Sequence, residues 1–470
     1  MKRRDFLANS ALAAATLAAR SAFAAPGQTT VTVRANRPLG TIAPDFTGVG
    51  YEISSVSRPG LLSASNKVYV QLVRTLGTQG VIRIGGNTAD YANYSPNAAA
   101  VSSPKATVIN DAVLKDLGGF LKATGWKLIW ALDLGRGTEA DAIAESKIIQ
   151  SIAGERLLAF EIGNEPDLFA RARHRNPEYR YEDWLAEYRR YKAALRKEFP
   201  RIPFAGPDAA VKTDWVTRFA ADEGKDSVLL AHHYYREGQN PTSSIEKLLG
   251  VDPKLQPQLT ALKAASQACG VPYRICEVNS FSGGGRPGVS DTMAGALWVL
   301  DYMFTLAANG CAGVNMETGV NQLDFISSYS PIGDDEHGHY SAKPEYYGML
   351  AFSLAAQGRL LTTEVDAGSP EVRAYATQSS KRGLALALIN KGATTSALTV
   401  NLGEHVRAKQ ASVIRLSAPT VDAKTAITLG GAEVTPEGTW KGAKTESTHV
   451  QKGQLAITLL PFSAAIVQIV

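Results

Sequence analysis

The amino-acid sequence predicts an α/β protein, a (β/α)8 or TIM barrel followed by a C-terminal antiparallel β-sandwich. Eight short apolar runs recur between residues 46 and 317, amphipathic stretches separate them, and after residue 357 short alternating segments follow. Apolar strands that alternate with helices are typical of a parallel sheet buried on both faces. Eight repeats fit a barrel, whose usual length is about 250 residues. An open doubly wound sheet is the alternative, but no glycine-rich phosphate loop follows the first run.

Each apolar run is expected to form one barrel strand. The runs cover residues 46–53, 81–86, 128–134, 158–163, 202–207, 228–235, 273–278 and 313–317. The stretches between them place apolar residues three and four positions apart, which indicates helices packed around the barrel. The clearest of these helices cover residues 67–76, 111–122, 139–152, 184–199, 292–308 and 347–357.

The segment after the last helix has the alternation of half-buried strands. Apolar and polar residues alternate at 372–376, 384–389, 396–402, 411–416 and 455–459, between turns rich in Gly, Asn, Thr and Lys. This pattern predicts an antiparallel sandwich of about 110 residues. Residues 29–34 also alternate, and we expect them to add an N-terminal strand to the same sandwich. The expected divisions are 25–40 for this strand, 41–357 for the barrel and 358–470 for the sandwich.

The first 24 residues have the pattern of an export signal. Lys2, Arg3 and Arg4 form a basic start, and the sequence Arg-Arg-Asp-Phe-Leu at 3–7 resembles a bacterial twin-arginine signal. The apolar stretch at 11–19 is too short to span a bilayer, and Ala-Phe-Ala at 22–24 fits a cleavage site. The sequence therefore predicts a signal peptide over 1–24 and a periplasmic or secreted protein.

Charge and cysteine content exclude several other classes of protein. The formal net charge is +5, but the predicted signal carries four basic residues against one acidic residue, so the remaining chain is near +2. This charge gives no support for nucleic-acid binding. No later apolar segment is long enough to span a membrane. Three cysteines in a chain of this length do not form a disulfide framework.

Polar side chains end several of the expected strands. Glu165 ends the fourth strand and Glu277 ends the seventh. Other polar residues at or just after strand ends are Glu52, Asn87, Asn164, His232, His233 and Tyr234. In a barrel of this type, the carboxyl ends of the strands form the active face. These residues are therefore expected to meet at one rim.

Two carboxylates on one rigid face are the equipment for cleaving a glycosidic bond. Asn164-Glu165-Pro166 at the end of the fourth strand, with Glu277 ending the seventh, resembles the large clan of retaining glycosidases built on this barrel. The resemblance implies that Glu165 is the general acid/base and Glu277 the nucleophile. We expect neighbours such as Tyr234 to orient Glu277, and we also place Tyr234 among the substrate-binding residues. Asn164 would bond the sugar 2-hydroxyl.

A more specific resemblance is to glycoside hydrolase family 79, which contains β-glucuronidases and heparanases. It rests on segments 83–90, 161–167, 206–208, 232–235 and 277–292, and most of all on the glycine-rich loop directly after Glu277. The similarity covers the barrel and extends into the sandwich. It implies that the backbone amides of Gly283 and Gly284, together with Tyr329, bind the substrate carboxylate. Glu52 and Asn87 would contact sugar hydroxyls.

The resemblance implies an exo-acting retaining β-glucuronidase that releases terminal β-linked glucuronic acid from a glucuronide, oligosaccharide or polysaccharide. Lys212 and Arg236 do not fall where endo-acting heparanases place their basic residues, which favours exo action. Three alternatives remain: an endo-β-glucuronidase acting on heparan sulfate, a β-glycosidase for a neutral sugar, and a carbohydrate-binding protein on an inactive barrel. The mechanism requires neither a cofactor nor a metal, and the acidic and histidine-rich stretch 334–339 is interpreted as a polar loop at the pocket mouth.

Overall fold

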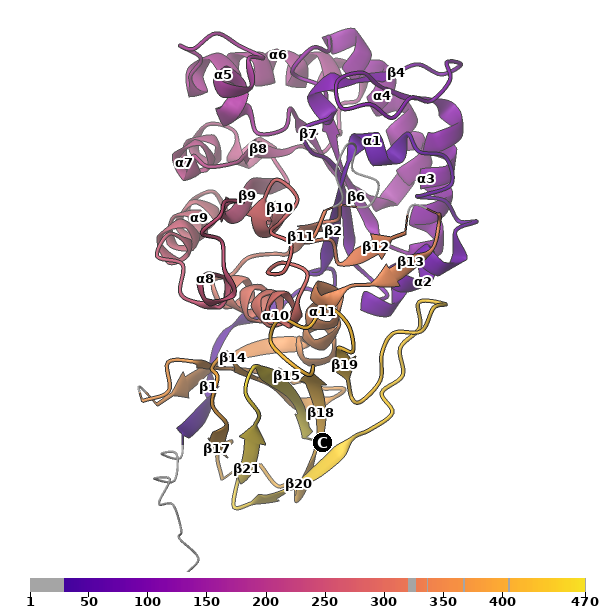
Figure 1. Ribbon diagram of the computed structural model, residues 1–470. Helices are drawn as coiled ribbons and strands as arrows, with labels where there is room; N and C mark the ends of the chain where they lie inside the picture. Colours follow the sequence, from indigo (N-terminus) through magenta and orange to yellow (C-terminus); the bar gives the residue numbers. More distant parts are fainter. Residues whose placement is uncertain (1–28, 320–326, 336, 367, 405, 470) are drawn as a thin grey trace, which may run out of the picture.

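The computed structural model describes residues 29–319, 327–335, 337–366, 368–404 and 406–469 (Figure 1). The predicted signal peptide at 1–24 lies outside these residues. Within them, no helix is long and apolar enough to cross a membrane.

Eight parallel strands form a nearly closed barrel. In sheet order they run β7-β6-β3-β2-β11-β10-β9-β8. Their bounds are β2 (Gly48–Glu52), β3 (Val81–Gly85), β6 (Lys127–Leu132), β7 (Leu157–Ile162), β8 (Ala205–Ala209), β9 (Leu229–Gly238), β10 (Tyr273–Ser282) and β11 (Val314–Glu317). The two edge strands meet at a parallel bridge between Phe160 and Phe204, which completes the ring. The predicted fold class, a TIM barrel with an antiparallel sheet domain, is confirmed.

Helices surround the barrel (Figure 1), and several of them begin at residues that supply capping groups. The larger ones are α2 (Lys67–Leu76), α3 (Asp111–Thr124), α4 (Glu139–Ala153), α6 (Tyr181–Glu198), α7 (Thr213–Asp222), α9 (Leu255–Cys269), α10 (Met293–Ala308) and α11 (Pro344–Ala355). The Asn66 side chain accepts from the amide of Tyr69 at the start of α2, and Thr138 and Asp141 form a capping box on α4. Gly125 ends α3 in the left-handed conformation.

The second domain is a ten-stranded, mostly antiparallel sheet, which packs below the barrel against α10 and α11 (Figure 1). Its strands are β1 (Thr29–Ile42), β14 (Gly358–Val365), β15 (Val372–Ser379), β16 (Gly383–Asn390), β17 (Ser396–Asn401), β18 (Gln410–Ser417), β19 (Thr428–Leu429), β20 (Glu446–Gln451), β21 (Gln454–Leu459) and β22 (Ser463–Ile469). The N-terminal strand β1 lies between β14 and β17. Buried contacts join the domains: the ring of Tyr375 stacks on Phe304, and Lys391 pairs with Asp301 at 2.7 Å.

Strands β8 and β10 each depart from regular pairing at one residue. Between β8 and β9 the register shifts at Asp208, and between β9 and β10 it shifts at Cys276. Each shift inserts one unpaired residue, a β-bulge, which re-aims the side chains that follow. Asp208 has a φ of 62°, and Glu165 at the end of β7 has a φ of 50°. Backbone of this kind persists only where the surrounding structure holds it in place, and it is concentrated at functional sites.

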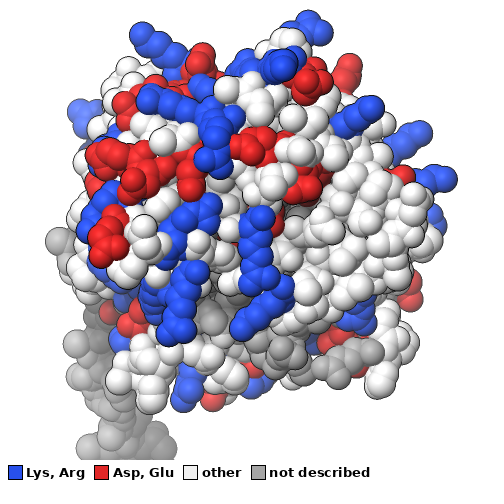
Figure 2. Space-filling view, turned by 90° about the horizontal axis from the view of Figure 1, so that it is seen from above, with Lys and Arg blue, Asp and Glu red and all other residues white. Residues whose placement is uncertain are grey.

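The surface viewed from above in Figure 2 carries both signs of charge. Lys and Arg side chains lie among Asp and Glu side chains on its left half, and its right half is mostly uncharged. Mixed charge of this kind gives this face no extended field of one sign for a polyanion.

Candidate active site

A buried arginine connects four of the barrel strands. Arg83 on β3 is completely buried and donates to Glu161 at 3.0 Å, Asn164 at 2.7 Å, Asp208 at 2.6 Å and Glu277 at 2.8 Å. Guanidinium is planar, always charged and rich in donors, so a single side chain can serve several carboxylates at fixed angles. Arg83 therefore sets the relative positions of β7, β8 and β10 at their carboxyl ends.

Both oxygens of Glu277 are held by donors. Arg83 donates to Oε2 at 2.8 Å, and the hydroxyl of Tyr235 donates to Oε1 at 2.9 Å. The carboxylate of Glu277 is thus oriented and supplied with compensating charge, as a nucleophile requires.

The prediction that Tyr234 orients Glu277 is wrong. The hydroxyl of Tyr234 donates to Asp252 at 2.7 Å, and its ring stacks on Tyr302 with centroids 5.0 Å apart. Side chains alternate along a strand, so His233 and Tyr235 share the inner face of β9 and Tyr234 turns toward the helices. Tyr235 is the residue that contacts Glu277.

Glu165 stands where a general acid is expected. It follows β7, and Pro166 directly after it begins the 3-10 helix η3 (Pro166–Leu168). Burial raises the pKa of Glu165, although its hydrogen bond with His233 partly opposes that rise. A carboxyl group with a raised pKa can remain protonated near neutral pH and deliver a proton.

The two glutamates face each other across a narrow gap. One oxygen of Glu165, one oxygen of Glu277 and one ring nitrogen of His233 all lie within 4.8 Å of one another. Retaining glycosidases place their two carboxyl groups about 5–5.5 Å apart, whereas inverting enzymes need about 6.5–9.5 Å to admit a water molecule. The gap is therefore close to the retaining distance.

A single cavity of about 1450 Å³ contains the predicted site residues. Its lining includes Glu52, Asn87, Asn164, Glu165, Tyr234, Glu277, Gly283, Gly284 and Tyr329. The structure thus brings together residues that lie more than 270 positions apart in the sequence. Their roles toward a substrate stay predictions.

Local hydrogen bonds fix the loops that carry these residues. Glu52 accepts from the amides of Asn87 and Thr88 at 3.1 and 2.8 Å, which joins the loops after β2 and β3. The carbonyl of Gly284 accepts from the amide of Ser328 at 2.6 Å, so the glycine-rich loop is joined to the segment that carries Tyr329. Gly283 and Gly284 have φ values of 78° and 85°, a backbone conformation that glycine adopts without strain.

The structure also shows a carboxyl group that the sequence reasoning missed. Glu317 ends β11, is 2% exposed and borders the cavity. Burial, followed by the charges of Glu277 and Glu52, raises its pKa well above the usual value for a glutamate. Burial also raises the pKa of Glu52 to about 7. Glu317 ends a strand just as Glu52 does, so the criterion that identified Glu52 could have identified it.

Arg83, Asp208 and Tyr235 were missed for a different reason. All three lie inside the segments that resemble family 79, namely 83–90, 206–208 and 232–235, but the sequence alone gives none of them a role. Their contacts depend on the bulges at Asp208 and Cys276 and on which face of β9 points inward. Alternation along β9, counted from His233, would have placed Tyr235 inward.

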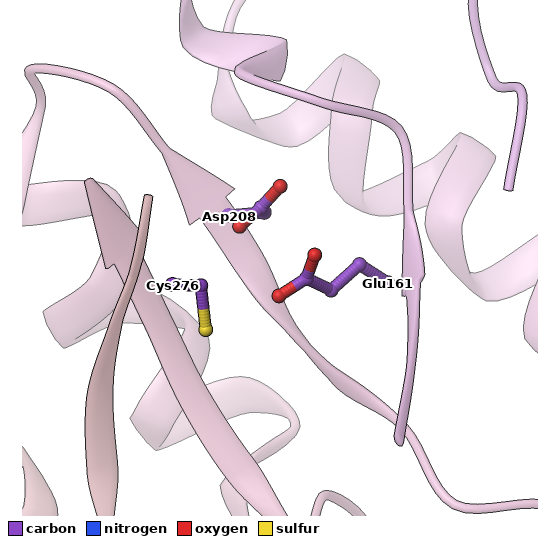
Figure 3. A group of neighbouring side chains, drawn as sticks. All are labelled: Glu161, Asp208 and Cys276. Carbon is purple, nitrogen blue, oxygen red and sulfur yellow. The ribbon is translucent and has the colours of Figure 1, made fainter. Parts of the chain in front are cut away.

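Two of the carboxylates that contact Arg83 also lie beside a buried cysteine, and these residue types can bind a metal ion. Glu161, Asp208 and Cys276 project from three strands into the same interior space, with their ligand atoms within 4.8 Å of one another (Figure 3). Arg83 donates to both of these carboxylates. Its guanidinium supplies the positive charge that the carboxylates need, so their grouping does not by itself indicate a metal.

The acidic and histidine-rich stretch at 334–339 lies elsewhere than predicted. Its described residues belong to the hairpin of β12 (Ile332–Asp334) and β13 (Tyr340–Ala342), where Asp335 and His339 pair at 2.7 Å. None of these described residues lines the cavity, so the prediction of a loop at the pocket mouth is wrong for them.

Comparisons with known proteins agree with this geometry. The family model for the glycosyl hydrolase family 79 C-terminal beta domain matches residues 374–466. A β-glucuronidase from Aspergillus niger is 26% identical over 416 residues, which cover 80% of this chain and 74% of that protein. A β-glucuronidase from Neurospora crassa is 27% identical over 356 residues, which cover 66% of this chain and 60% of that protein. The C-terminal domain of the chain thus matches glycoside hydrolase family 79, and the chain is a glycoside hydrolase.

Solved structures with the same fold extend beyond the family. A 4-O-α-L-rhamnosyl-β-D-glucuronidase from Fusarium oxysporum superimposes with a TM-score of 0.77 at 19% identity, covering 93% of this chain and all of that one. An α-L-arabinofuranosidase from Thermotoga petrophila superimposes with a TM-score of 0.70 at 14% identity, covering 94% of this chain and all of that one. At these identities the superpositions show a shared fold.

Replacing Arg83 with Met should strongly destabilise the protein. The change leaves Glu161 and Asp208 buried without their cation, and removing one partner of a buried ion pair typically costs about 3–5 kcal/mol. Loss of the cation raises the pKa of both carboxyl groups, so we expect the largest loss above neutral pH and a smaller loss in mild acid, where they take up protons. Urea unfolding at several pH values measures both effects.

The matched control is Arg34→Met, because Arg34 pairs with Glu364 on the exposed surface. Exposed ion pairs contribute little, so this change should leave the unfolding midpoint where it is. Equal unfolding midpoints for Arg83→Met and the wild type would contradict the conclusion that the buried ion pairs of Arg83 stabilise the barrel.

Proposed function

We propose that this glycoside hydrolase is a member of family 79 and an exo-acting retaining β-glucuronidase that releases terminal β-linked glucuronic acid. The observation that carries the proposal is the pair of facing carboxyl groups, with oxygens of Glu165 and Glu277 within 4.8 Å, in a cavity that also contains the glycine-rich loop. The β-glucuronidases of Aspergillus niger and Neurospora crassa support the choice of sugar.

In the first half of the reaction, a carboxylate oxygen of Glu277 attacks the anomeric carbon, and the bond to the leaving-group oxygen breaks. Glu165 gives its proton to that oxygen. Arg83 and Tyr235 hold the attacking carboxylate in one orientation, which reduces the entropy lost on reaching the transition state. In the second half, Glu165 takes a proton from water, and the hydroxide attacks the anomeric carbon and releases Glu277.

Recognition of the sugar would come from the loops around this pair. The amides of Gly283 and Gly284 and the hydroxyl of Tyr329 are suitable donors for a sugar carboxylate. The bond between the Gly284 carbonyl and the Ser328 amide keeps these donors on one wall of the cavity. Asn164, whose side-chain oxygen already accepts from Arg83, would donate its NH2 group to the sugar 2-hydroxyl.

A second candidate is endo-acting cleavage of an acidic polysaccharide. The cavity volume of about 1450 Å³ exceeds the range of about 300–1,000 Å³ usual for small-molecule sites. Three exposed cationic residues, Lys105, Arg171 and Lys254, also border it. A cavity of this size could accept additional sugars, and the cations could bind their negative charges. This candidate predicts cleavage within the chain of heparan sulfate.

We also propose that the protein is exported through its twin-arginine sequence. The support is the sequence pattern at 1–24 alone, because those residues lie outside the described structure. In a bacterium with an active twin-arginine pathway, the full chain should be found in the periplasm or medium, and a variant with Arg3→Lys and Arg4→Lys should be retained in the cytoplasm. Equal export of both proteins would refute this route.

The wild-type enzyme should hydrolyse p-nitrophenyl β-glucuronide, and both Glu165→Gln and Glu277→Gln should lose activity. Loss of the nucleophile should lower kcat by at least about 10³-fold for any leaving group. Loss of the acid should lower kcat/KM by about 10²–10⁴-fold for an alkyl glucuronide, but by less for an aryl one, whose leaving group needs little protonation. Initial rates on both substrates measure the difference.

The control is Glu198→Gln, an exposed glutamate at the end of α6, which should keep wild-type rates. Cleavage of p-nitrophenyl β-xyloside in place of the glucuronide would overturn the choice of sugar. Depolymerisation of heparan sulfate without cleavage of the aryl glucuronide would favour the endo-acting candidate.

A further inference from the structure

His233 lies between the two glutamates and a buried aspartate. It is on the inner face of β9, completely buried, and its Nδ1 lies 3.0 Å from Oε1 of Glu165. On the other side of the ring, Nε2 lies 2.7 Å from Oδ1 of Asp208. Nδ1 is also 3.9 Å from Oε2 of Glu277. The imidazole therefore faces an acceptor at each nitrogen.

An imidazole can donate from both nitrogens only when it is protonated and carries a positive charge. Asp208 is well suited to hold that charge, because Arg83 binds its other oxygen at 2.6 Å and keeps it ionised. Interaction with Arg83 and His233 outweighs burial and lowers the pKa of Asp208 to about 2. Burial alone would lower the pKa of His233, but Asp208 and Glu277 outweigh it and hold that pKa well above its usual value.

Charged and titratable groups surround this imidazole from every neighbouring strand. Those that interact with His233 or with Glu165 are Glu161 on β7, Asp167 on η3, Asp208 on β8, His232 and Tyr235 on β9, Glu277 on β10 and Glu317 on β11, and Arg83 on β3 contacts Asp208. Burial raises the pKa of Glu317 and of Glu161, so the carboxylate that favours a charged ring most directly is Asp208, which lies 2.7 Å from Nε2. A positive imidazole is therefore the state that this environment favours.

We propose that His233, held as an imidazolium by Asp208, is a positioning residue that fixes which oxygen of Glu165 carries the exchanged proton and sets the upper pH limit of its action as an acid. This inference rests on the proposed role of Glu165 as the acid/base. The N–H group at Nδ1 donates a hydrogen bond to Oε1 of Glu165, so the proton that Glu165 gives to the leaving group lies on Oε2.

The proton balance through the reaction follows from this arrangement. When the glycosidic bond breaks, the proton on Oε2 of Glu165 moves to the leaving-group oxygen, and Glu165 becomes a carboxylate. The imidazolium keeps both of its protons and stabilises that new charge through Nδ1–H. When water attacks the glycosyl-enzyme, one water proton returns to Oε2. His233 thus acts through Glu165 and exchanges no proton itself.

Removing the imidazolium should move the pH profile in one direction, toward higher pH. A nearby cation favours the ionised form of a carboxyl group, so His233 lowers the pKa of Glu165 relative to burial alone. Removing the imidazolium raises that pKa, and Glu165 then stays protonated to higher pH. The basic limb of kcat/KM, which reports the acid in the free enzyme, should move to higher pH. At the same time, hydrolysis of the glycosyl-enzyme should slow, because the carboxylate loses its stabilising donor.

The test compares the pH profiles of the wild type, His233→Asn and His232→Asn on an alkyl and an aryl β-glucuronide. His232 is a matched control: it is equally buried on the same strand, but its Nδ1 contacts the carbonyl of Ala209 and its Nε2 lies 3.3 Å from the Thr213 hydroxyl. We expect the basic limb to move to higher pH in His233→Asn alone. A uniform loss of rate with an unmoved basic limb would reduce His233 to a structural role and overturn the proposal.

A second measurement covers the case in which His233→Asn does not fold. Nitrogen NMR of the wild-type protein with labelled histidine should show one buried imidazole that keeps both ring protons well above neutral pH. Its signal should shift in Glu165→Gln and not in Glu198→Gln. If the signal that shifts in Glu165→Gln comes from a ring that is neutral at neutral pH, the proposal is also overturned. This readout needs no substrate, so failure of the wild type to cleave glucuronides would refute the proposed function without deciding the charge of His233.

Discussion

The ion-pair network of Arg83 is the interaction on which the rest of the site depends. A guanidinium fully removed from water is costly unless each of its donors finds a partner. Arg83 meets that condition with one amide and three carboxylates from β7, β8 and β10. Through Asp208 it also reaches His233, and through His233 it reaches Glu165. Glu165 and Glu277, the proposed acid/base and nucleophile, are thus connected to the same buried cation.

The loops above this network are held by carboxylates that accept backbone amides. Asp90 accepts from the amides of Leu134, Gly135 and Asn164 at 2.9–3.1 Å, which links the loops after β3, β6 and β7. Asp167 accepts from three successive amides, those of Ala210, Val211 and Lys212, at 2.8–2.9 Å. With Glu52, these contacts join neighbouring loops around half of the rim. A site held in this way needs little reorganisation when substrate binds.

Sequence reasoning identified the barrel and its facing glutamates because both follow from local patterns. Apolar runs reveal buried strands, and a polar residue at the end of such a run is visible without a structure. The assignment to Tyr234 failed because the inward face of β9 was not counted from His233. The sequence analysis did not predict strands β14, β19, β20 and β22 of the second domain. Strand β14 directly follows a helix, β19 has two residues, and β20 is mostly polar, with half of its residues exposed. Strand β22 pairs on both sides, with β16 and β18, and so reads as a continuous apolar run. The register shifts at Asp208 and Cys276 depend on two strands at once, so neither strand's sequence reveals them.

Together these observations describe a rigid barrel floor that orients Glu277, a buried imidazole that faces Glu165, and loops that complete the cavity around both. The most direct test of this account is to trap the glycosyl-enzyme with a 2-deoxy-2-fluoro-glucuronosyl fluoride and to map the modified peptide by mass spectrometry. A fluoroglucuronosyl adduct on Glu277, absent from Glu277→Gln, is the predicted result. Turnover of the reagent with no adduct at any residue, and glucuronic acid released from substrate as the α-anomer, would contradict it.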